Sequence, residues 1–388
     1  MNAGWEKKLL SEVCTLINGR AYKKDELLET GKYPVLRVGN FFTNNHWYYS
    51  NLELDVNKYC DNGDLLYAWS ASFGPRIWGG GKAIYHYHIW KVLPNPALVD
   101  KNFLFRLLEW DVDQIKLSHG TGTTMMHVSK GSMESRNVPL PPLPEQQRIV
   151  SILDEAFAGI ATATANAEKN LANARELFES YLQSVFSNKG DDWEEKTLGE
   201  VLLKTETVNP TKTPNEEFVY LDVSSVNKET KEIENASLLF GKDAPSRARK
   251  LIRTNDVIFA TVRPTHSRVA KITEEYDEQV CSTGYFVLRT KEFLNNNLVF
   301  YFLLTHGFNK QMEKLQKGAS YPAVTDSEVK GIYIQFPKSL KTQLKIVQKL
   351  DELSAETKRL ESIYQKKLIT LEELKKSILN QAFSGQLQ

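Results

Sequence analysis

The sequence contains an internal repeat, because its two halves carry the same motifs in the same order. Residues 5–13 (WEKKLLSEV) match residues 193–201 (WEEKTLGEV), and residues 146–155 (QQRIVSILDE) match residues 343–352 (QLKIVQKLDE). Unrelated apolar strings would not keep their order and a nearly constant offset across the chain. The two halves therefore derive from one ancestral unit, and each must fold into a similar structure.

Each half combines strand-like and helix-like patterns. Residues 33–38 and 218–223 alternate as half-buried strands do, and a tight turn feeds an apolar strand at 62–68 and at 254–260. At 388 residues the chain also exceeds what one hydrophobic core usually organises. The expected fold class is α+β with a pseudo-two-fold repeat of two similar mixed α/β domains. Its predicted parts are a domain at 1–143, a long helix at 144–188, a second domain at 189–337 and a second helix at 338–388.

Both long helices carry the apolar spacing of a coiled coil, with apolar or small residues mostly four and then three positions apart. Before the first helix, the prolines of residues 139–144 (PLPPLP) exclude a helix and predict a stiff extended connector, whereas the second junction keeps only Pro337. Forty-odd helical residues predict a rod of roughly 60 to 65 Å. The predicted seam consists of Ile149, Leu153, Ile160, Ala167, Leu171 and Phe178 in the first helix and of Ile346, Leu350, Leu353, Leu360, Tyr364, Leu371 and Ile378 in the second.

We expect the two helices to pack against each other in antiparallel orientation as a spacer between the domains. Residues 161–174 are dominated by small side chains, whereas the second helix is bulky around Ile363, so Ala167 should lie near Ile363. An antiparallel return also brings the C-terminus back beside Trp5. Such domains are related by a pseudo-two-fold axis, as the half-sites of duplex DNA are. The alternative is that each helix packs only on its own domain.

Composition limits the partners and the compartment. A formal net charge of +1 and a pI near 7.6 exclude a strongly basic chromatin-type protein and a uniformly acidic DNA mimic, so a nucleic-acid surface must be local. Cys14, Cys60 and Cys281 lie far apart in sequence, which favours buried thiols in a reducing compartment. No segment approaches the roughly 20 apolar residues that span a bilayer. We therefore expect a soluble, cytoplasmic protein.

The junctions and helix ends resemble those of the specificity subunits of type I restriction-modification systems, the HsdS family. The resemblance is carried by residues 138–150 (VPLPPLPEQQRIV), 181–187 (YLQSVFS) and 378–385 (ILNQAFSG), and it extends over essentially the whole chain. It is weakest inside the two domains, which in this family differ with the DNA target. Residues 336–343 (FPKSLKTQ) depart from the pattern, because they lack the triple proline of the first junction.

The resemblance implies a non-catalytic subunit for host defence by DNA methylation and restriction. Its two domains would be target-recognition domains that bind a bipartite, asymmetric site in double-stranded DNA, one half-site each. Its helices would dock two modification subunits, which methylate adenine N6 with S-adenosylmethionine, and restriction/translocase subunits, which use ATP and Mg²⁺. This chain itself would bind none of these cofactors and no metal.

Several loops contain the residue types that contact DNA. Base readout requires paired donors or acceptors, and phosphate contact requires cations or backbone amides. We expect contacts from a basic turn beside an aromatic ring at 18–24, from Pro-containing loops at 69–76 and 261–268, from Gly-rich loops at 118–125 and 316–321, and from a basic cluster at 246–250. The alternative for each is a solvated charge run or an ordinary loop. The predicted DNA-binding residues are Arg20, Tyr22, Lys23, Lys24, Ser70, Ser72, Arg76, Thr121, Thr123, Thr124, Arg247, Arg249, Lys250, Arg263, His266, Arg268, Lys317, Ser320 and Tyr321.

The motifs of methyl transfer, ATP use and metal binding are not recognisable in the sequence. Residues 95–97 (NPA) and 209–211 (NPT) fail the Asn/Asp-Pro-Pro-aromatic pattern that holds an adenine amino group, and residues 79–83 (GGGKA) lack the spacing of a P-loop. Residues 86–88 (HYH) alternate as a strand would, which argues against a metal site. Two other functions remain open: a specificity subunit of a type II or methylation-only system, and a coiled-coil scaffold whose end domains bind proteins.

Overall fold

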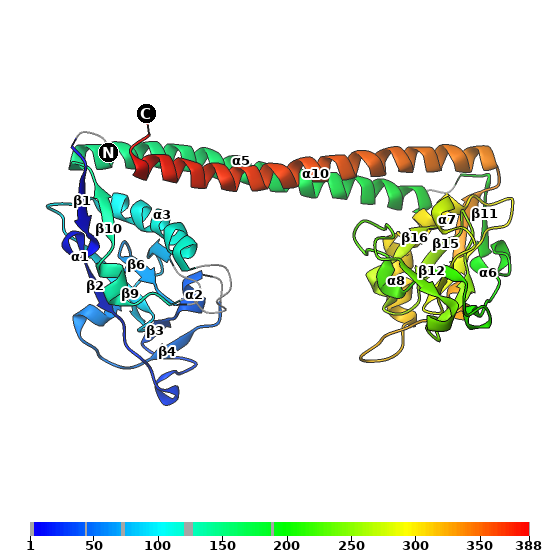
Figure 1. Cartoon of the computed structure of the whole chain (residues 1–388), viewed down its shortest axis with the longest axis horizontal. Helices are drawn as coiled ribbons and strands as arrows, with labels where there is room; N and C mark the ends of the chain where they lie inside the picture. Colours follow the sequence, from blue (N-terminus) through cyan, green and yellow to red (C-terminus); the bar gives the residue numbers. More distant parts are fainter. Residues whose placement is uncertain (1–3, 43–44, 71–73, 120–126, 188–189, 388) are drawn as a thin grey trace. The chain divides into compact units, whose positions relative to one another are not determined.

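The computed structural model describes residues 4–42, 45–70, 74–119, 127–187 and 190–387, and the chain divides into two compact units (Figure 1). Unit 1 comprises Met1–Ala167 and Lys366–Gln388, and unit 2 comprises Glu168–Gln365. Each unit holds one mixed α/β domain, together with part of α5 (Leu143–Ser187) and part of α10 (Leu340–Ser384).

Three small sheets form the domain of unit 1. Their only parallel pair within the described residues is β3 with β8, and the other pairs are antiparallel. The sheets are, in spatial order, β1 (Glu6–Leu9) and β10 (Asn137–Leu140); β2 (Cys14–Asn18), β9 (Ile89–Pro94), β6 (Leu65–Ala68) and β7 (Gly74–Ile77); and β4 (Tyr48–Ser50), β3 (Tyr33–Leu36), β8 (Ala83–Tyr85) and β5 (Tyr59–Cys60). The helices are α1 (Leu10–Val13), α2 (Val38–Phe42), α3 (Lys101–His119) and α4 (Lys130–Glu134), with 3-10 turns η1 (Lys24–Glu26) and η2 (Val56–Lys58).

Unit 2 repeats this topology. Its sheets are β11 (Trp193–Thr197) and β19 (Tyr333–Pro337); β16 (Val269–Lys271), β15 (Val257–Ala260) and β18 (Tyr285–Leu288); and β13 (Ser237–Phe240), β12 (Glu217–Leu221), β17 (Val280–Ser282) and β14 (Ala248–Leu251). The parallel pair is again the equivalent one, β12 with β17. Its helices are α6 (Leu198–Val201), α7 (Asn296–Leu303), α8 (His306–Leu315) and α9 (Asp326–Lys330), with 3-10 turns η3 (Pro210–Lys212), η4 (Val223–Ser225), η5 (Gly241–Asp243), η6 (Pro264–His266) and η7 (Glu274–Tyr276).

These topologies confirm the predicted repeat of two mixed α/β domains and the strands expected near residues 33, 65, 218 and 257. The two domains differ in the number of strands in one sheet, which has the order β2-β9-β6-β7 in unit 1 and β16-β15-β18 in unit 2. In unit 1 the strand β2 pairs with β9 over five residues, whereas in unit 2 a single bridge between Leu202 and Thr290 takes its place. The proline-rich connector expected at residues 139–144 differs in part from the expectation. Its Pro139 lies in β10 opposite Lys7 of β1, and its Leu143 and Pro144 already belong to α5, so only residues 139–142 lie outside the helix.

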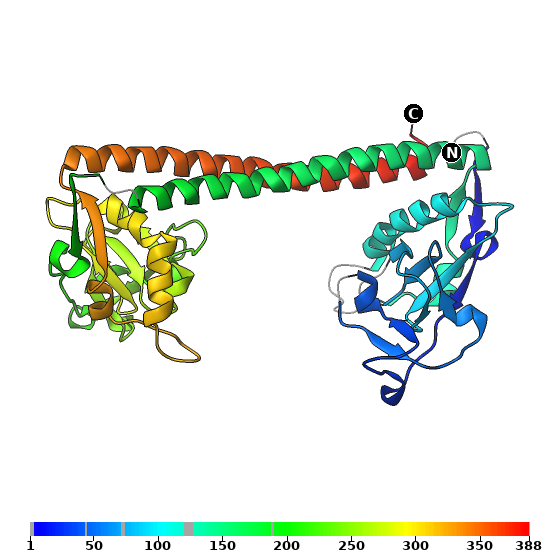
Figure 2. The same ribbon diagram turned by 180° about the vertical axis from the view of Figure 1, so that it is seen from behind.

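A helix lies between the sheets and the long helices in each unit, and two views agree on this for α3 of unit 1 (Figures 1 and 2). In unit 1, Phe103 of α3 packs edge-on against Phe383 of α10, with 5.4 Å between ring centroids. In unit 2, Phe302 of α7 packs against Phe186 of α5 in the same manner, at 5.6 Å. Burying one such side chain stabilises a fold by roughly 1.5 to 3 kcal/mol. Phe186 and Phe383 occupy corresponding positions in residues 181–187 (YLQSVFS) and 378–385 (ILNQAFSG).

The two long helices run antiparallel within each unit. In unit 2, Thr357 contacts the carbonyl oxygen of Ala174 at 3.4 Å and Glu361 accepts a hydrogen bond from Arg175 at 2.5 Å, while Leu182 shares a core with Leu350. In unit 1 the end of α10 packs in one core with the start of α5 and with α3, so α10 does not pack only on the domain that precedes it.

The residues predicted for the seam are all buried or half-buried in the structure. Ala167 is 1% exposed, whereas Ile363 is 45% exposed. Their proposed proximity would join one unit to the other and stays a prediction. The three cysteine thiols are buried, as expected, and burial raises the pKa of each to about 12. In the part of the chain that the structure describes, no helix is long and apolar enough to cross a membrane.

Candidate nucleic-acid interface

Three loops meet at one place in each unit, and the same backbone hydrogen bonds join them. In unit 1 they are the loop after β6, the turn between β8 and β9, and the segment before α4. In unit 2 they are the loop after β15, the turn between β17 and β18, and the segment before α9. In unit 1, the N–H of Trp69 donates to the carbonyl of His88 at 3.0 Å, and the N–H of Val128 donates to the carbonyl of Trp69 at 3.2 Å. In unit 2, the N–H of Thr261 donates to Gly284 at 2.8 Å, and the N–H of Val324 donates to Thr261 at 2.9 Å. The loops that follow β6 and β15 thus occupy equivalent positions. We call these places the loop clusters of unit 1 and unit 2.

An isolated β-bridge between the neighbouring residues of two of these loops is also equivalent in the two units. Ser70 pairs with His127 in unit 1, and Val262 pairs with Ala323 in unit 2. The short helices that follow, α4 and α9, both begin with a hydroxyl N-cap, from Ser129 and Thr325, that accepts a backbone N–H. The two clusters therefore share a scaffold but carry different side chains.

The loop cluster of unit 2 holds an arginine in a constrained position. Arg263 has a left-handed backbone with φ of 49°, and its N–H donates to the carbonyl of Pro322 at 2.7 Å. Its guanidinium lies 5.2 Å from the ring centroid of Tyr321, which is 72% exposed. Ser267, at the other end of η6, is also left-handed with φ of 48°. Non-glycine residues in this region cost about 1 to 3 kcal/mol each, so the surrounding contacts must hold the loop in place.

Arg263 is available for contact, since no carboxylate pairs with it among the described residues. Arginine fixed in this way presents the planar fork that reads guanine through two parallel hydrogen bonds. Ala323 forms strand-like bridges with both Lys317 and Val262. These bridges bring the predicted regions 261–268 and 316–321 together beside Arg263. His266, Ser320 and Arg247 are exposed.

The other predicted residues of unit 2 are held by partners within the unit. The Lys250 ammonium donates to the carbonyl of Tyr285 at 2.6 Å and to the carboxylate of Asp326 at 2.7 Å. Arg268 donates to the carbonyl of Val226, and Arg249 donates to that of Ala248 at 2.8 Å. Lys317 forms an exposed ion pair with Glu328 at 2.9 Å. A DNA contact by Lys250 or Arg268 would have to break these bonds, and their DNA-binding role stays a prediction.

In unit 1 the basic turn is partly neutralised. Arg20 forms two hydrogen bonds with Glu26, at 2.7 and 2.9 Å, and lies 5.2 Å from the centroid of the Tyr22 ring. The Arg20 guanidinium lowers the pKa of the Glu26 carboxyl to about 2. Lys23 and Lys24 are exposed. Arg20 is therefore engaged within its own turn, and the two lysines remain as candidates for phosphate contact.

The remaining predicted residues of unit 1 divide into three groups. Arg76 is exposed and lies 5.7 Å and 5.8 Å from the ring centroids of Phe41 and Phe42. Ser70 is buried, and its place is in the bridge to His127. Ser72, Thr121, Thr123 and Thr124 lie outside the described residues.

The sequence analysis missed an aromatic and imidazole group in the loop cluster of unit 1. The strand expected at residues 86–88 is wrong: β8 ends at Tyr85, and Tyr87 and His88 form a tight turn before β9. This turn lies against Trp69, whose ring centroid is 4.9 Å from that of His88 and 6.1 Å from that of His127. The repeat could have predicted this turn, because the equivalent residues of unit 2 are Thr283 and Gly284, and glycine is typical of turns.

The folded structure disfavours the protonated forms of two imidazoles in this group, those of His86 and His88. Burial, with smaller effects of the charges of His88 and Arg37, lowers the pKa of His86 to about 4. Burial and the neighbouring charge of His127 also lower the pKa of His88. The described residues include no group of three or more His, Cys, Asp or Glu side chains that could hold a metal ion.

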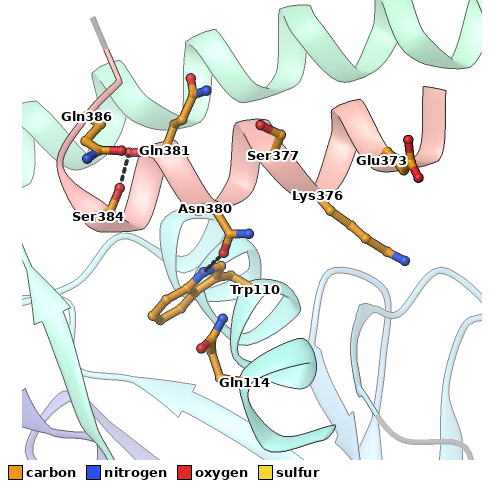
Figure 3. Close-up of a pocket in the computed structure, with 9 residues that line it drawn as sticks. All are labelled: Trp110, Gln114, Glu373, Lys376, Ser377, Asn380, Gln381, Ser384 and Gln386. Atoms are coloured by element: carbon orange, nitrogen blue, oxygen red, sulfur yellow. Dashed lines mark hydrogen bonds between the residues drawn. The ribbon is translucent and has the colours of Figure 1, made fainter. Parts of the chain in front are cut away.

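A groove of about 700 Å³ lies elsewhere in unit 1, between α3 and the end of α10 (Figure 3). The indole N–H of Trp110 on α3 donates to the side-chain oxygen of Asn380 on α10 at 2.7 Å. Amide and hydroxyl groups make up most of its lining, so it offers hydrogen bonds rather than acid–base chemistry. The lining residues are Trp110, Gln114, Glu373, Lys376, Ser377, Asn380, Gln381, Ser384 and Gln386.

Comparison with known proteins gives consistent relatives for the whole chain. A sequence model of the family described as type I restriction modification DNA specificity domain matches residues 2–171 and 190–371, once in each half. The chain is 25% identical to the type I restriction enzyme MjaVIII specificity subunit of Methanocaldococcus jannaschii, over 99% of this chain and 93% of that protein. It is 18% identical to the type I restriction enzyme EcoBI specificity subunit of Escherichia coli, over 99% of this chain and 86% of that protein.

Solved structures share the fold. A chain from the structural work on complex assembly and conformational transition of the type I R-M system superposes with a TM-score of 0.78 at 19% identity, over 100% of this chain and 99% of that one. The HsdS subunit from Thermoanaerobacter tengcongensis superposes with a TM-score of 0.59 at 18% identity, over 100% of this chain and 98% of that subunit. These likenesses concern the fold, and they agree with the expected order of two domains and two long helices.

Proposed function

Because the chain belongs to the type I restriction-modification DNA specificity family, we propose that it reads a bipartite, asymmetric sequence in double-stranded DNA, one half-site with each domain. The observation that carries this proposal is the pair of loop clusters. One backbone scaffold occurs twice, with Trp69, His88 and His127 in unit 1 where unit 2 has Thr261, Gly284 and Ala323. Equal scaffolds with unequal side chains suit two half-sites of different sequence.

Within this proposal the basic residues have two roles. The constrained Arg263, beside the exposed ring of Tyr321, suits a base contact in the major groove. The exposed Lys23, Lys24 and Arg247 suit phosphates, which fix the position of the protein on the duplex without reading its sequence. The modest net charge of +1 fits local contacts of this kind.

The long helices supply the distance between the half-sites and a surface for partners. Modification subunits would dock on α5 and α10, and the groove beside Trp110 offers hydrogen-bonding groups for such an interface. The partners would carry S-adenosylmethionine, ATP and Mg²⁺ and perform methylation and restriction. The chain would then act as a cytoplasmic, non-catalytic subunit that determines where its partners work.

Long-read methylation sequencing of cells that express the chain with its modification subunit tests the proposal. One bipartite adenine motif is the expected result, and its absence would overturn the proposal in favour of a coiled-coil scaffold that binds proteins. Replacing residues 1–143 by the corresponding domain of a relative should change one half-site only. When the restriction subunit and ATP are added, the complex should cleave unmodified DNA. Such ATP-dependent cleavage is not expected of a type II or methylation-only system.

A further inference from the structure

We propose that Trp69, His86, Tyr87, His88 and His127 form the surface with which unit 1 reads the bases of its half-site. This inference rests on the proposed function and names the specificity-determining residues of one domain. Trp69 begins the loop 69–76 that the sequence predicted to contact DNA, but none of the five was among the predicted DNA-binding residues. They come from three loops that are separate along the chain.

The five side chains form one continuous group. The ring centroid of Trp69 lies 5.8 Å from that of Tyr87 and 4.9 Å from that of His88, and the centroids of His86 and His88 are 4.9 Å apart. The indole N–H of Trp69 donates to the carbonyl of Tyr87 at 2.8 Å, which fixes the turn against the indole. His127 completes the group 6.1 Å from Trp69.

One side of this group is held by the core and the other is accessible. Trp69 stacks on the buried Trp90, with 5.8 Å between their centroids and 19° between their planes. Tyr87 is 36% exposed, and His127 is exposed as well. Rings that are fixed on one face and accessible on the other lose little conformational entropy when a ligand binds them.

The position of the group matches the place where unit 2 presents Arg263. The backbone bonds of Trp69 correspond to those of Thr261, and Arg263 follows Thr261 by two residues. In unit 2 the turn equivalent to residues 86–88 is small, with Thr283 and Gly284. The two equivalent loop clusters therefore differ in composition: that of unit 1 holds imidazole and aromatic side chains, and that of unit 2 holds Arg263 and Tyr321.

The chemistry of the group fits base edges in duplex DNA. A neutral imidazole offers one donor and one acceptor, and base edges in the major groove display both kinds of group. The aromatic rings suit apolar contact with a thymine methyl group. The basic turn adjoins the group, because Tyr22 stacks on His86 with 6.3 Å between ring centroids and the Tyr87 N–H donates to the carbonyl of Arg20 at 3.0 Å. Lys23 and Lys24 follow Tyr22 directly in this turn, and in this proposal they contact the phosphates beside the bases.

Binding to duplexes with single base changes tests this inference. The full chain is assembled with its modification subunits, and affinities are measured for the methylated motif and for duplexes that carry one altered base pair in either half-site. Domain exchange first identifies the half-site that residues 1–143 read. In the wild-type complex a wrong base pair should weaken binding roughly tenfold, since one good base contact corresponds to this discrimination.

The double variant His88→Ala, His127→Ala should reduce this discrimination to less than about threefold at one or more positions of the unit 1 half-site. Discrimination in the other half-site should stay. Discrimination at the remaining positions of the unit 1 half-site should stay as well, which shows that unit 1 is folded. If the double variant does not fold, His127→Ala alone carries the same expectation, because that side chain is exposed. His306→Asn, an exposed histidine of unit 2, is the matched control and should leave both half-sites unchanged.

The same measurements distinguish a failure of the proposed function from a failure of this inference. A wild-type complex that prefers no duplex overturns the proposed function and this inference with it. A wild-type complex that discriminates, combined with histidine variants that discriminate equally well at every position, overturns this inference alone. An equal loss in the His306→Asn control also overturns it, because the effect would then not belong to the loop cluster of unit 1.

Discussion

The side chain of Gln146, which is completely buried in unit 1, accepts a hydrogen bond from the backbone N–H of Asp100 at 2.8 Å. Its amide nitrogen donates to the carbonyls of Leu98 and Pro141 at 2.9 and 2.8 Å. One glutamine thus ties the start of α5 to the loop before α3 and to the proline-rich junction. It is a fully buried link between the domain and its long helix.

Gln343 makes the same three bonds in unit 2. It accepts from the N–H of Asn295 at 2.7 Å and donates to the carbonyls of Phe293 and Pro337 at 2.9 and 2.7 Å. The second junction therefore keeps its anchor although it lacks the triple proline of the first.

Replacing either glutamine by alanine should lower the free energy of unfolding by roughly 3 kcal/mol, because buried backbone groups lose their partners. Chemical denaturation of Gln146→Ala and Gln343→Ala measures this effect. The adjacent Gln147 is exposed, so Gln147→Ala should change the stability by less than about 0.5 kcal/mol. Equal effects of Gln146→Ala and Gln147→Ala would contradict the anchoring role.

The substitution Arg263→Lys separates base reading from charge. Lysine keeps the positive charge but not the planar fork, so discrimination at one base pair of the unit 2 half-site should fall roughly tenfold. The salt dependence of binding should stay nearly constant, because the number of cations is unchanged. Binding measured on matched and mismatched duplexes at several salt concentrations checks both. A shallower salt dependence with intact discrimination would instead assign Arg263 to a phosphate.

Acidification should destabilise unit 1 before the carboxylates titrate. The pKa of His86 falls from 6.5 to about 4 on folding, chiefly through burial, and that of His88 is lowered as well. Between pH 6.5 and about 5 the unfolded chain therefore binds more protons than the folded chain, so the free energy of unfolding decreases as the pH falls and is recovered above pH 6.5. Denaturation curves at several pH values measure this slope.

The variant His86→Asn provides the comparison for the pH dependence. It removes one of the two titrating groups, so its stability should depend less steeply on pH in the same window, whatever its stability at pH 7 is. A slope identical to that of the wild type would show that other groups cause the acid sensitivity.

Shortening both long helices by one heptad should change the spacing of the DNA site and nothing else. Seven residues correspond to roughly 10 Å of helix, or about three base pairs of duplex. The methylated motif of such a variant should contain the same two half-sites with a shorter gap, as long-read sequencing would show. Removing the heptad from α5 alone should abolish methylation, because the seam residues of the two helices would then be out of register. An unchanged gap after the paired deletion would refute the spacer role.

The sequence by itself determined the architecture of this protein. Order-preserving matches such as residues 146–155 with 343–352 required two similar structures, and the three-and-four spacing of apolar residues required two long helices with one apolar stripe each. Both signals are local or periodic, so they can be read without knowing the tertiary structure. They located the strands near residues 65 and 257. The residues predicted for the seam are buried or half-buried, and their pairing across the two helices stays a prediction.

The composition of the loop clusters was decided by the tertiary structure alone. Trp69, His88 and His127 are separated along the chain, and their proximity depends on the turn between β8 and β9 and on the bridge between Ser70 and His127. The folded chain likewise decided that Lys250 is held by Asp326 while Arg263 is held against Tyr321. Two cations that were both predicted to contact DNA differ in this way because ion pairs and ring contacts form across loops, where no periodicity relates one residue to the next.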